Sequence, residues 1–135
     1  MYCYCICTEL EFSVNIEPST ITVLNTTSYN SFSIICTATI PANVTAVKSF
    51  VWRKGPSGTG IVLSNSDEGI SITTLNADEA VSTSVLTTNE TTPGSYLYTC
   101  DVTVLSYPSS ATANVIVNGR QISCLEYNTM LVLRA

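Results

Sequence analysis

The stretch Gly94-Ser95-Tyr96-Leu97-Tyr98-Thr99-Cys100 decides the fold of this chain. It reads as a β-strand, because its larger side chains recur at the period of two that is typical of a half-buried strand. The alternation turns Tyr96, Tyr98 and Cys100 toward one face. An inward-facing cysteine in a strand-rich chain calls for a partner. The best candidate is Cys36, which lies in an earlier apolar run.

The composition favours a single strand-rich domain. With 135 residues, the chain is long enough to bury one hydrophobic core. Hydrophobic residues make up 45% of it and charged residues only 11%, which excludes an intrinsically disordered tail. Thr, Ser and Val are abundant, and β-branched side chains suit a pleated surface. No window shows a sustained apolar period of 3.6, so we expect little helix.

Charge and residue content argue against several functional classes. The net charge is −5 with only five basic residues, too few for a phosphate-binding patch, so we expect no nucleic-acid partner. The chain has no histidine, which excludes a Ser-His-Asp triad and a Cys-His pair. No glycine-rich phosphate loop precedes a helix. We therefore expect no catalytic residues and no cofactor.

Two acidic pairs, Asp67-Glu68 and Asp78-Glu79, fall in predicted turns. Their adjacent carboxylates lack the alternating ligand positions of a calcium loop, so we interpret them as solvated loop charge rather than a metal site.

Six cysteines and three glycosylation sequons favour an oxidising compartment over a cytosol with reduced, buried thiols. The sequon asparagines are Asn25, Asn43 and Asn89, each in a predicted loop or turn that a glycosylating enzyme could reach. We therefore expect an extracellular or cell-surface glycoprotein.

The two ends of the chain break the strand pattern. Residues 1–10 carry Cys3, Cys5 and Cys7, but zinc ligands are usually spaced by two to four residues and often include histidine. We interpret this segment as truncated or poorly ordered, with palmitoylation as a weaker alternative. Residues 119–135 form a tail whose apolar run is too short to cross a bilayer. Cys124 in this tail is either free or paired with an N-terminal cysteine.

Between these ends, short apolar runs alternate with turns. This rhythm indicates a sandwich or a barrel. Pro18 is tolerated at a sheet edge, so we expect one edge strand broken in two there. The predicted strands cover residues 12–16, 20–24, 32–39, 48–53, 61–63, 70–73, 81–86, 96–104 and 111–117.

Residues 11–118 resemble a domain of the immunoglobulin superfamily, on the pattern Cys36, Trp52 and Tyr98-x-Cys100. The resemblance implies an all-β fold: a two-sheet antiparallel β-sandwich of seven to nine strands with Greek-key connections and one inter-sheet disulfide, Cys36–Cys100. It also implies that Trp52 packs against this bridge and that the Tyr98 hydroxyl turns back to the backbone at a strand corner.

Two positions depart from the family pattern. Gly94 and Tyr96 stand where the family often has an acidic residue and a glycine or alanine, so the usual ion pair to an arginine is not expected. The long span between the two cysteines leaves room for an extra strand at 61–63, which makes the domain variable-like or intermediate.

The resemblance implies protein–protein recognition or adhesion, as in surface receptors. Possible partner contacts are Tyr29, Tyr107 and Gly58 in the turn 55–60, although Tyr107 also suits a plain packed turn. The partner is an unidentified protein or a second copy of the chain. The alternative is a structural spacer without a binding site of its own. Carbohydrate binding is a third idea, supported only by scattered aromatic residues.

Overall fold

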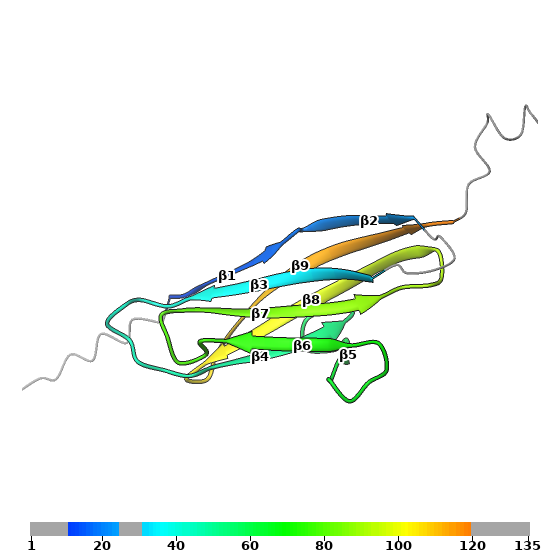
Figure 1. Cartoon of the computed structure of the whole chain (residues 1–135). Coiled ribbons are helices and arrows are strands. Elements are labelled where there is room, and N and C mark those ends of the chain that lie inside the picture. The colour runs from blue at the N-terminus through cyan, green and yellow to red at the C-terminus, as the bar shows by residue number, and fades with distance from the viewer. Residues whose placement is uncertain (1–10, 25–30, 120–135) are drawn as a thin grey trace, which may run out of the picture.

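The computed structural model describes residues 11–24 and 31–119, and it arranges them as two β-sheets packed face to face (Figure 1). The four-stranded sheet has the order β1-β3-β7-β6, and the five-stranded sheet has the order β2-β9-β8-β4-β5. All pairs are antiparallel except β2 with β9. The strands are β1 (Ser13–Glu17), β2 (Thr20–Leu24), β3 (Ser31–Thr39), β4 (Lys48–Lys54), β5 (Ile61–Val62), β6 (Ser71–Leu75), β7 (Val81–Asn89), β8 (Gly94–Val104) and β9 (Tyr107–Asn118). The described residues contain no helix able to cross a membrane.

A disulfide joins the two sheets through the middle of the core. The sulfurs of Cys36 on β3 and Cys100 on β8 are 2.12 Å apart, and the two residues are separated by 64 in sequence number. Trp52 on β4 lies directly opposite Cys100 in the strand register, and both are buried. The predicted β-sandwich with one inter-sheet disulfide is therefore confirmed. Closing a loop of this length stabilises the fold by about 4 kcal/mol in the chain-entropy model.

The edge strand predicted to break at Pro18 changes sheets there. β1 pairs antiparallel with β3, whereas β2 pairs parallel with β9 in the opposite sheet. The Glu17–Pro18 peptide bond between them is cis. A proline has no backbone N–H to contribute to a ladder, so the break falls where the chain leaves one sheet for the other.

The inner face of β7 is lined with hydroxyl groups. Ser82, Ser84 and Thr88 are buried there, while Val81 and Val85 face outward. The Trp52 indole Nε1 donates to Ser84 Oγ at 2.9 Å. Throughout the described ranges, every buried side-chain nitrogen or oxygen has a hydrogen-bond partner. The core therefore tolerates the hydroxyls of Ser82 and Ser84, because Lys48 and Trp52 on the opposite sheet donate to them.

Candidate functional site

Three connections meet at one end of the sandwich, which we call the loop end. They are residues 40–47 between β3 and β4, 76–80 between β6 and β7, and 105–106 between β8 and β9, at the left of Figure 1. Backbone hydrogen bonds tie two of them together. The Ile40 N–H donates to Ala80 O and the Lys48 N–H to Ala77 O, each at 2.9 Å. These hydrogen bonds hold the two connections at the loop end in a fixed arrangement.

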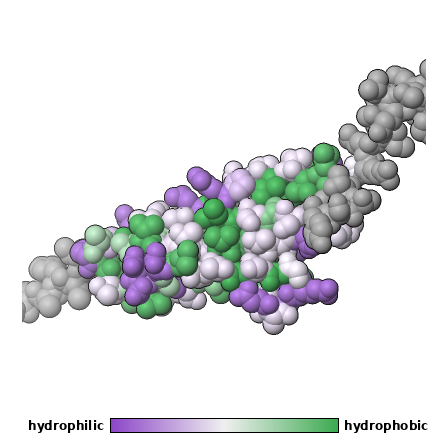
Figure 2. Space-filling view, in the orientation of Figure 1, coloured by the Kyte–Doolittle hydropathy of each residue, from purple (hydrophilic) through white to green (hydrophobic). Residues whose placement is uncertain are grey.

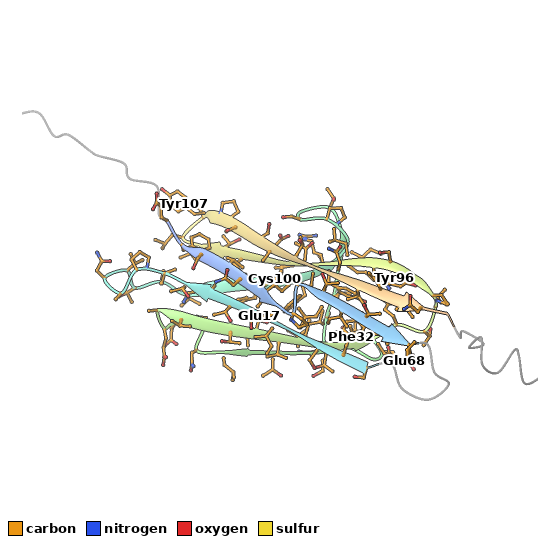
Figure 3. The ribbon with its side chains drawn as sticks, turned by 90° about the horizontal axis from the view of Figure 1, so that it is seen from above. Glu17, Phe32, Glu68, Tyr96, Cys100 and Tyr107 are labelled. Atoms are coloured by element: carbon orange, nitrogen blue, oxygen red, sulfur yellow. A yellow bond between two sulfur atoms is a disulfide. The ribbon has the colours of Figure 1, made fainter. Side chains whose placement is uncertain are left out.

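The loop end exposes three apolar side chains, which we call the apolar patch. Val47 is 70% exposed, Leu105 62% and Tyr107 40%. The register Lys48↔Val104↔Tyr107 places all three residues at this end of the five-stranded sheet, since each lies at or beside one of these paired positions. Figure 2 shows hydrophobic and hydrophilic residues side by side at this end, and Figure 3 places Tyr107 there. Grouped apolar exposure of this kind marks interaction surfaces.

The hairpin between β8 and β9 holds two non-glycine residues in the left-handed region. Leu105 has φ of 59° and Ser106 has φ of 119°. A tight hairpin turn with both central residues at positive φ usually carries Asn and Gly. An L-residue in this region costs about 1–2 kcal/mol. Exposed Leu105 regains none of this by burial, and strain of this kind is more common at functional sites.

The only cation at this end among the described residues is hidden. Lys48 is 3% exposed, and its Nζ donates to Ser82 Oγ at 2.6 Å and to the backbone oxygen of Glu79. Desolvation lowers the pKa of Lys48, and the nearby charges of Asp78 and Glu79 offset part of that effect. Asp78 and Glu79 are themselves exposed, so this end presents negative charge to solvent.

Over the whole described surface, too, basic side chains are paired or buried and most acidic side chains are exposed. Its other two basic residues are engaged in ion pairs, Arg53 with Asp101 at 2.8 Å and Lys54 with Glu90. The exposed charged residues are all acidic: Glu11, Glu17, Asp67, Glu68, Asp78 and Glu79.

Solved structures share this architecture, although no protein-family model and no curated protein matches the sequence. A chimeric titin Z1Z2 is 16% identical with a TM-score of 0.52, over 84% of this chain and 100% of that chain. The BTLA ectodomain is 18% identical with a TM-score of 0.52, over 82% and 99%. A complex of titin M10 with an obscurin-like 1 Ig domain gives 23% identity and a TM-score of 0.51, over 82% and 99%. The chain has an immunoglobulin-like fold. At these identities the likeness shows the fold alone.

In this immunoglobulin-like domain, Gly58 does not lie with the apolar patch. The connection 55–60 is held against the five-stranded sheet by Asp101, which accepts from Ser57 Oγ at 2.5 Å and from the Gly58 N–H at 3.0 Å. Partial burial would raise the pKa of Asp101, but the hydrogen bonds from Ser57, Gly58 and Arg53 outweigh it and hold the pKa below its usual range. The structure thus separates the predicted contacts Gly58 and Tyr107. Tyr29 lies outside the described residues.

The prediction that the Tyr98 hydroxyl bonds to the backbone is wrong. It donates to the carboxylate of Glu90, which is buried beside it at the end opposite the loop end. The backbone contact belongs instead to Tyr96, whose hydroxyl donates to Thr92 O at 2.6 Å. Burial raises the pKa of Tyr98, and the hydrogen bond to Glu90 adds to the rise. The position where the family often has a small residue thus supplies the corner tyrosine.

The remaining predicted positions divide between the described residues and those outside them. Asn43 and Asn89 are exposed, Asn43 in the loop 40–47 and Asn89 at the end of β7. Five other predicted positions lie outside the described residues: Asn25, Cys3, Cys5, Cys7 and Cys124.

Neither Val47 nor Leu105 was predicted as a contact. The sequence did contain one signal for Leu105. The two-residue turn between Val104 and Tyr107 lacks the Asn or Gly that such a hairpin turn usually carries.

Proposed function

We propose that this immunoglobulin-like domain is a protein-recognition module of an extracellular or cell-surface protein, rather than an enzyme, and that the loop end contacts the partner. The observation that carries this proposal is the exposed patch of Val47, Leu105 and Tyr107 on a strained hairpin. The Cys36–Cys100 disulfide and the exposed sequons at Asn43 and Asn89 support an oxidising compartment.

The charge at the loop end favours one kind of partner. Asp78 and Glu79 are exposed at the loop end, while Lys48 is buried and its Nζ donates to the backbone oxygen of Glu79. A partner surface with apolar side chains and lysine or arginine complements this arrangement. A second copy would bring another acidic loop end, and like charges would oppose the contact. The proposal therefore favours a different, basic protein over homophilic contact through this end.

A binding screen tests the proposal. The wild-type domain, displayed as an oligomer to raise avidity, is screened against a panel of protein ectodomains. A Leu105→Ser/Tyr107→Ser variant should lose at least about tenfold in affinity for any ectodomain found, because it removes the central apolar contacts. The matched control is Ile61→Ser/Val62→Ser, which removes two apolar residues of β5 that are at least as exposed and should bind normally. Normal binding by Leu105→Ser/Tyr107→Ser would place the contact elsewhere and contradict the proposal.

A spacer role is the second candidate. β1 begins at the loop end and β9 ends at the opposite end, so the chain runs the length of the domain, as a spacer requires (Figure 1). A spacer predicts that the full panel yields no ectodomain whose binding depends on Leu105 and Tyr107.

A further inference from the structure

β6 is an edge strand of the four-stranded sheet, with β7 on its only paired side. An open edge presents unpaired N–H and C=O groups and can recruit a strand from another molecule. The sequence of β6 (Ser71–Leu75) carries no charge to discourage this. The loop between β5 and β6 lies alongside, at the lower right of Figure 1.

The side chain of Asn65 in this loop occupies the edge. Its Oδ1 accepts from the Ile72 N–H at 2.5 Å, and its Nδ2 donates to Ile72 O at 2.9 Å. These are the two backbone groups that a neighbouring strand would bond. An amide side chain has the same donor and acceptor as a peptide group, so Asn65 replaces one residue of a missing strand.

The loop is folded so that Asn65 stays in place. Asp67 Oδ2 accepts from the Ser64 N–H at 2.9 Å, and the Asp67 N–H donates to Ser64 O at 2.9 Å. The Ile70 N–H, on the same side of the chain as that of Ile72, donates to Asp67 O at 3.3 Å. By the alternation of β6, Thr74 is the next residue whose backbone groups point to the open side.

We propose that the edge of β6 is a latent self-association surface, and that Asn65 closes it against antiparallel pairing with β6 of a second copy. Such pairing is isologous, because the same uncharged strand is presented by both molecules. The other edge strands are less suited to pairing with a second copy. β5 has two residues, and β1 meets β2 at Pro18, which cannot donate to a ladder. This site is distinct from the loop end, and the proposal does not depend on the proposed function.

The experiment compares Asn65→Ala with wild type and with Ser66→Ala, a neighbour whose side chain shares a hydrogen bond with Ser64 Oγ and makes none to β6. In dilute Asn65→Ala the Ile72 amide should exchange with deuterium about tenfold faster, since its hydrogen bond is gone. The Thr73 amide, which faces β7, should not change. At high concentration, sedimentation should show a dimer that wild type and Ser66→Ala do not form.

Two further variants keep the outcome clear. Asn65→Ala/Thr74→Pro removes the next outward N–H, so the dimer should weaken at least about tenfold relative to Asn65→Ala. Asn65→Asp loses the donor to Ile72 O but places a negative charge at the open edge, so it should remain monomeric. The proposal is overturned if Asn65→Ala sediments as wild type does, if Ile72 exchange is unchanged, or if Thr74→Pro leaves the dimer intact.

Discussion

The two ends of this sandwich use their polar groups in opposite ways. At the end that holds Glu90, the carboxylate is buried, pairs with Lys54 and accepts from Tyr98, and the Tyr96 hydroxyl bonds to the backbone. At the loop end the cation of Lys48 is buried and the apolar and acidic side chains stay exposed. The polar groups at the first end therefore bond to one another inside the domain. The loop end keeps a strained turn and exposed apolar side chains, as binding sites often do.

The largest effect should come from breaking the Glu90 end. Glu90→Ala leaves the Tyr98 hydroxyl buried without its acceptor and removes the partner of Lys54, so the free energy of unfolding should fall by about 3 kcal/mol. Chemical denaturation followed by Trp52 fluorescence measures this. Glu79→Ala at the loop end removes an exposed carboxylate and should leave the midpoint unchanged within error. Equal losses at the two ends would erase the distinction drawn between them.

The loop end should respond in the opposite direction. Leu105→Asn places a residue that tolerates positive φ in the hairpin turn, so the free energy of unfolding should rise by about 1 kcal/mol. The same change removes an apolar contact and should weaken partner binding. Val47→Asn is the control, because it removes apolar exposure without relieving a positive φ. Destabilisation by Leu105→Asn would show that the left-handed turn carries no strain.

The fold was accessible from sequence because its determinants are local patterns. The alternation around Cys36 and Cys100, with Trp52 between them, identifies strands that must face one another across the core. The sequence did not show which face of β7 is buried. Its residues offer two registers one position apart, and a shift by one residue exchanges the two faces. Leu86, together with the donors Trp52 and Lys48 on the opposite sheet, selects the register that buries Ser82 and Ser84.

The site was accessible only in part. Tyr107 was a candidate contact, but its neighbours Val47 and Leu105 come from other segments, and only pairing of the strands assembles them. The partner of Tyr98 was missed for the same reason. Glu90 lies eight residues earlier in sequence, beyond a turn, and its burial beside the hydroxyl depends on how β7 and β8 connect.

The smallest effects should appear in the pH dependence of stability, where the two ends have opposite signs. The pKa of Lys48 in the folded chain lies below its usual 10.5, so between the two values the unfolded chain binds more protons and stability rises with pH. The pKa of Tyr98 lies above its usual 10.0. Above that pH the unfolded chain has released a proton that the folded chain keeps, so stability falls.

Melting temperatures from about pH 7 to about pH 12 should therefore pass through a maximum near pH 10. Lys48→Met removes the titrating amine and should flatten the rise below the maximum, whereas Tyr98→Phe should flatten the fall above it. Each variant serves as the control for the other, because the two side chains lie at opposite ends and share no contact. A rise that persists in Lys48→Met would mean that another group causes it, and a lowered pKa of Lys48 would no longer distinguish the loop end.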